Sequence, residues 1–308
     1  MKLVFFGTPN FAVPTLEKLN ESKHSVLAVI TSPDNKSGRG LKLTSPPIKK
    51  YAIKNNLVLK QPYSLKDESL NDFLTDLNAD LFVVVAFKIL PENIINIPKY
   101  GSINLHASLL PKYRGAAPVH HAILNGDKTL GLTTFFLNKK IDTGDILLQN
   151  KLTITNNTTT GEALQDLSNM GSALILNTIT KIKNKSILIR KQNHLNASFA
   201  PKITTKDSKI NWHSNADKIH NQIRAFSPIP GAYTYINKKR IKLFESRIIL
   251  NNEYKLDPGY ICLKNNIFLI GTSTNSISIS KIHIEGKKIL TTLQFISGYS
   301  HLDGKKFD

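Results

Sequence analysis

Short apolar runs and amphipathic stretches alternate along the first half of the chain. Leu3–Phe6 is apolar and ends at Gly7, the stretch after it has leucines at helical spacing, and a second apolar run spans Val26–Ile30. Leu81–Ala86 is apolar at every position, as is typical of a strand buried on both faces of a parallel sheet. Because strand, helix and strand follow one another, the pattern predicts an α/β fold with a Rossmann-like, doubly wound parallel sheet.

The same alternation continues through the rest of this predicted domain. Gly131–Asn138 and Ile146–Ile154 are predicted strands, and Thr159–Lys183 is a predicted long amphipathic helix. From 184 to 206, Lys, Asn and Ser dominate and the apolar periodicity is lost, which indicates a linker. The first predicted domain is therefore 1–183.

Residues 207–308 form a second predicted domain that is rich in short strands. A helix is expected from Ser214, as its N-cap, to Phe226. Five short runs follow at near-regular spacing with Gly and Asn between them, which is the pattern of a small OB-like β-barrel. These runs are Tyr233–Ile236, Arg240–Ile249, Gly259–Leu263, Ile267–Ile270 and Ser276–Ile284. Barrels of this kind commonly bind nucleic acid, and a purely structural appendage is the alternative.

A chain of 308 residues exceeds the length at which a single core usually stops growing, which favours two domains. No apolar run approaches the ~20 residues of a membrane span, and the N-terminus shows no cleavable signal pattern. We therefore expect a cytoplasmic protein without membrane association. The single cysteine, Cys262, excludes an intramolecular disulfide and a Cys-x-x-Cys metal site. We expect no metal, and we expect Cys262 to be buried in a strand.

The formal net charge is +19, from 41 basic and 22 acidic side chains. Such an excess favours a polyanionic partner, and a composition biased toward Lys is the alternative explanation for part of it. Residues 1–183 carry 21 basic and 14 acidic side chains, whereas 184–308 carry 20 and 8, so the excess leans toward the C-terminal domain. Six of the basic residues are Arg, whose planar guanidinium binds phosphates and bases in a way that Lys does not.

The segment 31–47 is rich in Gly, Pro, Ser and Asn and is too long for an ordinary connection between a strand and a helix. From 33 to 54, six basic residues accompany a single acid, Asp34. A solvated loop and a loop that grips phosphates both remain open as interpretations. The candidates for phosphate or groove contacts are Lys36, Arg39 and Lys42, of which Arg39 stands between two glycines.

The most specific chemistry comes from two polar residues in 102–106. Asn104 and His106 lie two positions apart where apolar and polar residues alternate, so a strand would present both on one face. An amide donor beside an imidazole can stabilise an oxyanion, and the carboxylate of Asp142, from a later loop, can hold the imidazole charged and oriented. This trio, Asn104, His106 and Asp142, suits acyl transfer. For His106 alone, a structural, hydrogen-bonded histidine is the alternative.

The residues that follow His106 strengthen the catalytic interpretation. Ser108–Pro118, together with Asp142–Asp145, resembles the signature of the 10-formyltetrahydrofolate-dependent formyltransferases. The resemblance spans nearly the whole chain. Three further motifs are similar to the branch of that family that formylates methionyl-tRNA: Phe6–Pro9, Gly38–Gly40 and Arg224–Pro228.

This resemblance implies transfer of a formyl group from 10-formyltetrahydrofolate, as co-substrate, to the amino group of methionine on charged initiator tRNA, for translation initiation. It implies catalytic roles for Asn104, His106 and Asp142. It also implies that the loop with Lys36, Arg39 and Lys42 enters the acceptor end of the tRNA.

The resemblance further implies a folate site directly after the catalytic strand. The implied contacts are Ser108, Leu109, Leu110 and Pro111. The proline fixes φ and removes a donor, which would make a rigid backbone edge against a flat ligand. The chain departs from the family at Ala86–Pro91, where the family usually has a Tyr-Gly pair and one more residue.

Two other functions remain open at this point. A formyltransferase that acts on a small amine, such as a ribonucleotide or an amino sugar, would use the same trio. A tRNA-binding protein that has lost catalysis is an alternative of another class, and the intact trio argues against it. The basic loop and the basic C-terminal domain favour tRNA over a small amine. We expect a monomer without a protein partner.

Overall fold

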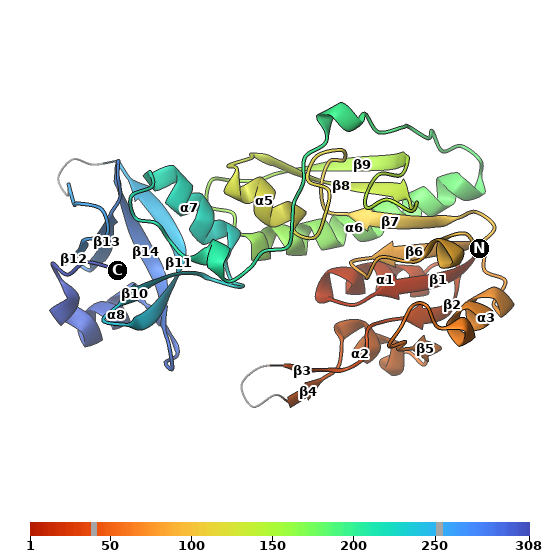
Figure 1. Cartoon of the computed structure of the whole chain (residues 1–308), viewed down its shortest axis with the longest axis horizontal. Coiled ribbons are helices and arrows are strands. Elements are labelled where there is room, and N and C mark those ends of the chain that lie inside the picture. Colours follow the sequence, from red (N-terminus) through yellow and green to blue (C-terminus); the bar gives the residue numbers. More distant parts are fainter. Residues whose placement is uncertain (38–41, 251–254) are drawn as a thin grey trace. The chain divides into compact units, whose positions relative to one another are not determined.

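The structure is a computed structural model that describes residues 1–37, 42–250 and 255–308. The chain divides into two compact units (Figure 1). The first unit comprises Met1–Gly115, Leu130–Leu152 and Leu164–Ala200, and the second comprises Ala116–Thr129, Thr153–Ala163 and Pro201–Asp308. Most of the predicted linker therefore belongs to the first unit, and two inner segments of the chain belong to the second.

A seven-stranded sheet with the order β5-β2-β1-β6-β7-β8-β9 forms the centre of the first unit. Its strands are β1 (Lys2–Gly7), β2 (Ser25–Ile30), β5 (Leu59–Lys60), β6 (Leu81–Val85), β7 (Ser102–His106), β8 (Thr129–Phe136) and β9 (Ile146–Thr153). The strands from β5 to β7 in this order run parallel, which confirms the predicted Rossmann-like fold.

The sheet is mixed, whereas a wholly parallel sheet was expected. β8 pairs with β7 antiparallel, with Thr133 opposite His106 and Phe136 opposite Ile103. The reason is the connection between the two strands. The chain returns to the sheet from the end at which β7 finishes, so no crossover is made and the direction reverses.

The helices of the first unit include one that packs closely against β7. They are α1 (Val13–Asn20), α2 (Pro47–Lys54), α3 (Glu68–Asp76), α4 (Glu92–Ile95) and most of α6 (Thr160–Lys183). α6 approaches β7 closely, because a β-carbon at Gly171 would lie 2.5 Å from Cδ2 of Leu105. Leu105 points to the face opposite that of Asn104 and His106. α6 therefore packs on the face of β7 that does not carry the candidate catalytic residues.

The basic segment predicted as a loop contains two short strands. β3 (Asn35–Ser37) and β4 (Lys42–Thr44) pair antiparallel. Just before β3, the carboxylate of Asp34 accepts hydrogen bonds from Lys49 Nζ at 2.8 Å and from Gln61 Nε2 at 3.0 Å. These contacts fasten the segment to the rest of the unit. Runs of only three residues carry too little periodicity to be recognised as strands in a sequence.

The second unit is built on a six-stranded antiparallel sheet, in agreement with the predicted barrel-like domain. Its strands are β10 (Ala232–Ile236), β11 (Lys239–Ile249), β12 (Ile261–Lys264), β13 (Ile267–Gly271), β14 (Ser276–Ile284) and β15 (Ile289–Thr291). Its helices are α5 (Pro118–Leu124), α7 (Ala216–Ala225) and α8 (Thr292–Tyr299). The N-cap of α7 is Asn215, whose side chain accepts from the Lys218 N–H at 2.8 Å, and not Ser214 as expected.

Aromatic rings stack within the mainly aliphatic core of the second unit. Phe268 stacks on Phe295 with ring centroids 4.9 Å apart, and the single tryptophan, Trp212, stacks on Phe307 at 5.5 Å. The indole N–H of Trp212 donates to Thr234 Oγ1 at 3.0 Å. Cys262 is buried in β12, as predicted.

In the described residues, no helix is both long enough and apolar enough to cross a membrane. Within the same residues, His, Cys, Asp and Glu side chains do not gather in threes in a way that could hold a metal ion.

Candidate active site

β7 presents Asn104 and His106 on one face of the sheet. Ile103 and Leu105 point to the opposite face and are buried, while on the first face His106 is buried and Asn104 is half-buried. His106 is 6% exposed and packs edge-on against the ring of Phe135 from β8. Both polar side chains are therefore held by regular structure, as the spacing predicted.

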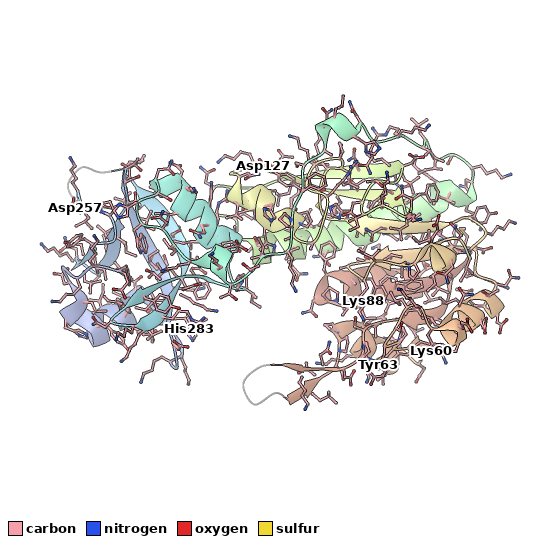
Figure 2. The ribbon with its side chains drawn as sticks, in the orientation of Figure 1. Lys60, Tyr63, Lys88, Asp127, Asp257 and His283 are labelled. Atoms are coloured by element: carbon pink, nitrogen blue, oxygen red, sulfur yellow. The ribbon has the colours of Figure 1, made fainter. Side chains whose placement is uncertain are left out.

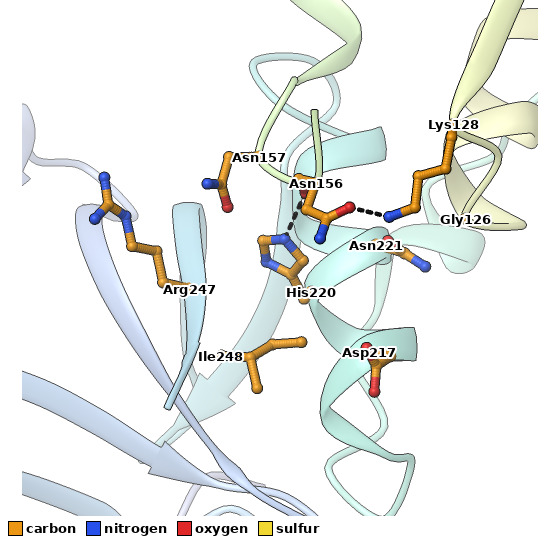
Figure 3. A pocket seen from close by; sticks show the side chains of 9 residues that line it. All are labelled: Gly126, Lys128, Asn156, Asn157, Asp217, His220, Asn221, Arg247 and Ile248. Atoms are coloured by element: carbon orange, nitrogen blue, oxygen red, sulfur yellow. Dashed lines mark hydrogen bonds between the residues drawn. The ribbon is translucent and has the colours of Figure 1, made fainter. Parts of the chain in front are cut away.

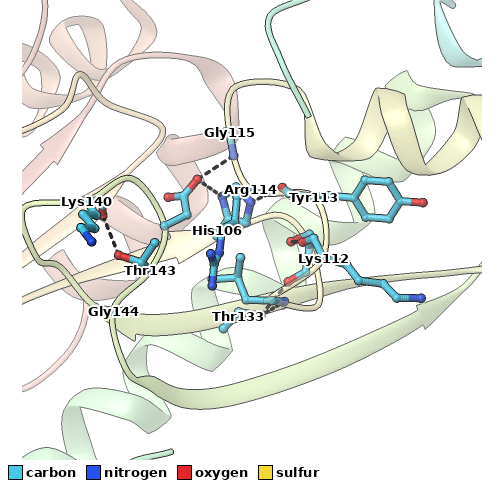
Figure 4. Close-up of polar contacts among 12 residues, drawn as sticks. His106, Lys112, Tyr113, Arg114, Gly115, Thr133, Lys140, Thr143 and Gly144 are labelled. Atoms are coloured by element: carbon cyan, nitrogen blue, oxygen red, sulfur yellow. Dashed lines mark hydrogen bonds and ion pairs between the residues drawn. The ribbon is translucent and has the colours of Figure 1, made fainter. Parts of the chain in front are cut away.

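The His106 ring is fixed from two sides (Figure 4). Nε2 lies 2.8 Å from the carbonyl oxygen of Tyr113, and because a carbonyl only accepts, Nε2 carries the proton. Nδ1 lies 3.7 Å from Oδ2 of Asp142, close enough for an ion pair when the ring is charged but too far for a hydrogen bond. The Nδ1 side of the ring is therefore oriented by the carboxylate without being tied to it.

Asp142 reaches His106 from the loop between β8 and β9. Its side chain is 11% exposed, and its Oδ2 accepts a hydrogen bond from the Gly115 N–H at 2.8 Å. Its φ of +52° is in the left-handed region, which Asp tolerates better than most residues. The structure thus brings together all three members of the predicted trio.

The segment after β7 joins His106 and Asp142. Tyr113 supplies the carbonyl for the imidazole, and Gly115 supplies the N–H for the carboxylate. Gly115 has φ of +121°, and a β-carbon there would lie 2.6 Å from the carbonyl oxygen of Ala200. Only glycine fits this position without a shift of the backbone.

The Asp142 loop is closed by its own contacts. Thr143 Oγ1 donates to Asn138 Oδ1 at 2.9 Å, and a β-carbon at Gly144 would collide with the carbonyl oxygen of Phe136. The motif Asp142-Thr143-Gly144 therefore has a geometric basis. Thr and Gly let the loop fold back against the end of β8, so that the carboxylate faces His106.

Gln192, which lies in the predicted linker, also contacts this loop. Its side-chain Nε2 donates to the carbonyl oxygens of Asp142 at 3.0 Å and Gly144 at 2.7 Å. Its Oε1 accepts from the guanidinium of Arg114. No local pattern in the sequence marks Gln192, since its partners lie 48 to 78 positions away.

The turn Ser108–Pro111, predicted to contact folate, bonds mostly within the protein. Ser108 Oγ donates to the Lys112 carbonyl at 2.7 Å. The Leu110 N–H donates to Thr133 Oγ1 at 3.1 Å, and the Leu110 carbonyl accepts from Gln149 Nε2 at 3.0 Å. Ser108 and Leu110 are buried, whereas Leu109 and Pro111 are half-buried. The turn is therefore a rigid edge, and Leu109 and Pro111 are the members with exposed surface.

The segment that departs from the family, Ala86–Pro91, begins at the end of β6. Val85 pairs with Leu105, so this segment starts beside the end of β7. Phe87 turns inward against Phe6, with ring centroids 5.7 Å apart, while Lys88, labelled in Figure 2, and Ile89 are exposed. An aliphatic side chain thus offers apolar surface in this segment.

The three predicted tRNA contacts fall on or between β3 and β4. Lys36 is exposed on β3, and the backbone of Lys42 opens β4. Arg39 lies outside the described residues. Their roles stay predictions.

The second unit contains a pocket of about 400 Å³ (Figure 3). Its lining includes Lys128, His220 and Arg247 and contains no member of the trio. His220 uses both ring nitrogens, one with Ser246 Oγ and one with the Asn156 carbonyl, each at 2.8 Å. Burial lowers the pKa of His220, which keeps the ring neutral. His220 is therefore a paired structural residue and offers this pocket no free base.

Comparison with known proteins follows the division of the chain. Residues 1–179 match the family described as formyl transferase, and residues 202–300 match formyl transferase, C-terminal domain. Methionyl-tRNA formyltransferase of Thermodesulfovibrio yellowstonii is 42% identical over 297 residues, which cover 96% of this chain and 95% of that protein.

Solved structures share the fold. The sugar 3N-formyl transferase WlaRD, crystallised in the presence of dTDP and 5-N-formyl-THF, is 25% identical with a TM-score of 0.68, covering 94% of this chain and 99% of that one. Methionyl-tRNA formyltransferase from Clostridium thermocellum has a TM-score of 0.56 at 19% identity, covering 82% of this chain and 95% of that one.

Proposed function

The chain belongs to the formyl transferase family, and on this basis we propose that it transfers the formyl group of 10-formyltetrahydrofolate to the free amino group of methionyl-initiator tRNA, using Asn104, His106 and Asp142. The predicted family and the predicted class of enzyme are confirmed. The proposal adds three points: the catalytic roles of the trio, 10-formyltetrahydrofolate as the formyl donor, and the cytoplasm as the location of the protein.

The observation that carries this proposal is the placement of His106 beside Asp142 and on the same face as Asn104. His106 Nδ1 is directed toward the carboxylate at 3.7 Å. The side-chain amide of Asn104 has no hydrogen-bond partner among the described residues, so its N–H groups are available to a ligand. An available amide beside an oriented imidazole is the arrangement that an oxyanion requires.

The reaction follows from this geometry. The amine nitrogen of the methionine attacks the formyl carbon, and the carbonyl electrons move to the oxygen. Asn104 and charged His106 stabilise that oxyanion, while Asp142 keeps the imidazolium in place. Collapse of the tetrahedral intermediate breaks the bond from the formyl carbon to N10 of tetrahydrofolate. N10 gains a proton and the amine loses one, with Asp142 as the nearest carboxylate to relay it.

The first unit has surface suited to a folate beside the trio. The Ser108–Pro111 turn is rigid because its backbone groups are already bonded, so it can present the surface of Leu109 and Pro111 without reorganising. Ile89 adds apolar surface in the segment that starts beside the end of β7. We assign the pterin contact to this apolar surface. The Ser108 hydroxyl is not part of it, because it already donates a hydrogen bond to the Lys112 carbonyl.

Two features favour tRNA over a small amine as acceptor. The first is the insertion with β3 and β4, which carries the exposed Lys36. The second is the basic excess of 184–308, with 20 basic and 8 acidic side chains, because such an excess suits a phosphate backbone. The likeness to WlaRD, a sugar formyl transferase, makes an amino sugar the alternative acceptor.

A formylation assay separates these possibilities. Initial rates are measured with 10-formyltetrahydrofolate and three acceptors: charged initiator tRNA, free methionine and an amino-sugar nucleotide. We expect tRNA to exceed the others by at least about a hundredfold in kcat/KM, because remote contacts to the tRNA lower the barrier. Comparable kcat/KM for the amino-sugar nucleotide would establish a small-amine enzyme instead.

The same assay tests the trio. His106→Ala and Asp142→Asn should each lower kcat by roughly a hundred- to a thousandfold, since each disturbs stabilisation of the oxyanion. Filter binding should show tRNA affinity within about twofold of the unchanged protein, because neither side chain is a tRNA contact in this proposal. A rate within about tenfold of the unchanged protein for either variant would show that the trio is misassigned.

A further inference from the structure

The side chain of Gln192 is buried beneath the Asp142 loop with all of its hydrogen-bonding capacity in use. It is 7% exposed, and both N–H groups of its amide donate to the loop, to the carbonyls of Asp142 and Gly144. Its oxygen accepts twice from Arg114, from Nε at 3.2 Å and from Nη2 at 2.6 Å. A buried amide that satisfies every donor and acceptor fixes the orientation of all its partners.

Arg114 is itself immobilised by the segment around Gln192. It is 6% exposed, its N–H donates to the Ser198 carbonyl at 2.8 Å, and its carbonyl accepts from the Ala200 N–H at 2.7 Å. Its Nη2 also donates to His194 Nδ1 at 2.9 Å. Burial lowers the pKa of Arg114, while the charge of Asp142 raises it.

We propose that Gln192 is a positioning residue for Asp142. This inference rests on the proposed role of Asp142 in formyl transfer. The segment Arg114–Gly115 holds Asp142 in two ways: the Gly115 N–H binds the carboxylate, and the Arg114 guanidinium, through Gln192, holds the backbone from which that carboxylate projects. The same segment follows Tyr113, whose carbonyl holds His106. The His106 ring and the Asp142 carboxylate are thus positioned by the same short segment, Tyr113–Gly115.

The loop needs this support because its conformation is not a relaxed one. Asp142 has a left-handed backbone with φ of +52°, and such residues persist where their surroundings fix them. If Gln192 cannot donate, the carbonyls of Asp142 and Gly144 lose these partners and the loop shifts. The 3.7 Å separation of His106 and Asp142 depends on that loop, and misplacement by about 1 Å can cost on the order of a hundredfold in rate.

The key variant is Gln192→Glu. Glutamate keeps the size of glutamine and can still accept from Arg114, but it places an acceptor where the two loop carbonyls need donors. Gln192→Met, which is similar in length and makes no such hydrogen bonds, is the second variant. Leu188→Met, at a 75% exposed and uncharged position of the same segment, is the control.

We expect both Gln192 variants to lower kcat for charged initiator tRNA by roughly ten- to a hundredfold, with KM for tRNA within about twofold, and we expect Leu188→Met to leave both constants unchanged. Thermal unfolding followed by circular dichroism shows whether each variant is folded at the assay temperature. A folded Gln192→Glu with an unchanged kcat overturns the proposal.

A double-mutant cycle separates positioning from a general structural effect. Single-turnover rates, with enzyme in excess, are measured for Gln192→Glu with Asp142 and in the Asp142→Asn background. If Gln192 acts through Asp142, Gln192→Glu lowers the single-turnover rate by at most about threefold in the Asp142→Asn background. The same factor in both backgrounds overturns the proposal. A full rate for Asp142→Asn alone refutes the assigned trio, and the acceptor assay is unaffected by that result.

Discussion

At the scale of single residues, completeness of hydrogen bonding separates supporting side chains from those available to a substrate. Gln192 and His220 are both buried, and both have partners at every polar atom. Asn104 lies on β7, and its side-chain amide has no hydrogen-bond partner within the described residues. The free amide of Asn104 can therefore bind a ligand without breaking a hydrogen bond within the protein, whereas the side chains of Gln192 and His220 cannot.

The neutral state of His220 predicts a pH dependence of stability. Burial lowers its pKa in the folded chain below the ordinary value of 6.5, so the unfolded chain binds the proton first. The stability that His220 contributes is therefore full above about pH 6.5 and is lost as pH falls toward the folded pKa. Replacing it with a group that does not titrate, in His220→Gln, should make the loss of stability between pH 7 and pH 5 shallower.

Urea unfolding followed by Trp212 fluorescence measures this effect, because Trp212 belongs to the same unit as His220. One group can contribute a slope of at most about 1.4 kcal/mol per pH unit. Above pH 7.5 the free energy of unfolding should change with pH at the same rate in the unchanged protein and in His220→Gln. Equal slopes below pH 6 as well would mean that His220 is not held neutral.

At the scale of elements, the sequence was most informative where one pattern repeats. β6 is apolar at five successive positions and is buried at all five, so its place inside the sheet was predictable. β3 and β4 were not, because three residues carry no period. The reversal of β8 was not predictable either, since it depends on where the chain re-enters the sheet.

The candidate site divides in the same way. Asn104 and His106 followed from strand spacing, whereas the arrival of Asp142 beside them came from the resemblance to a family. Neither strand spacing nor the resemblance to a family indicated a role for Gln192. Its segment has no apolar period, and its partner Arg114 is 78 positions away, a separation that only the folded chain reveals.

In the turn that links His106 to Asp142, the single methyl group added by Gly115→Ala should strongly lower both stability and activity. Gly115→Ala places a β-carbon 2.6 Å from the Ala200 carbonyl oxygen and forces alanine to adopt φ of +121°. We expect a loss of at least about 2 kcal/mol in the free energy of unfolding. We also expect at least about a tenfold fall in kcat, because the Gly115 N–H holds the Asp142 carboxylate.

Gly298→Ala is the matched control for this prediction. Gly298 lies within α8, and no atom is within 4 Å of the position that a β-carbon would take. Alanine there should stabilise the protein by about 0.5 kcal/mol, since it restricts the unfolded chain. Thermal unfolding and the formylation rate measure both variants. A Gly115→Ala protein that behaves like Gly298→Ala would contradict the tight fit of this turn.

At the scale of the whole molecule, the two units are interleaved along the chain. Residues 116–129 and 153–163 belong to the second unit, although both precede the end of the first. Within the second unit, the buried guanidinium of Arg224 joins them, donating to the Ile123 and Thr158 carbonyls at 3.4 and 3.2 Å. A single cut cannot therefore separate the units cleanly.

This arrangement predicts different outcomes for two shortened chains. One ends at Lys183 and the other at Ala200, and both lack 201–308. Only the longer chain keeps the two backbone hydrogen bonds between Arg190 and Ile146 and the contacts of Gln192 with the Asp142 loop. We expect the shorter chain to bind 5-formyltetrahydrofolate at least about tenfold more weakly, because the Asp142 loop at the proposed site lacks support.

Calorimetric titration measures both affinities, with circular dichroism as a check on folding. Equal affinities would mean that 184–200 is a linker that the catalytic loops do not need. A weaker shorter chain would assign this segment to the catalytic unit.

Cys262 gives the second unit a natural reporter. It is the single thiol of the chain, it is 6% exposed in β12, and burial raises its pKa. A thiol-specific reagent therefore reacts with the folded protein mainly when the strands around Cys262 part. The rate of labelling measures how often these strands open locally. Comparing the rates with and without charged tRNA shows whether the nucleic acid suppresses the opening, and the protein needs no engineered label.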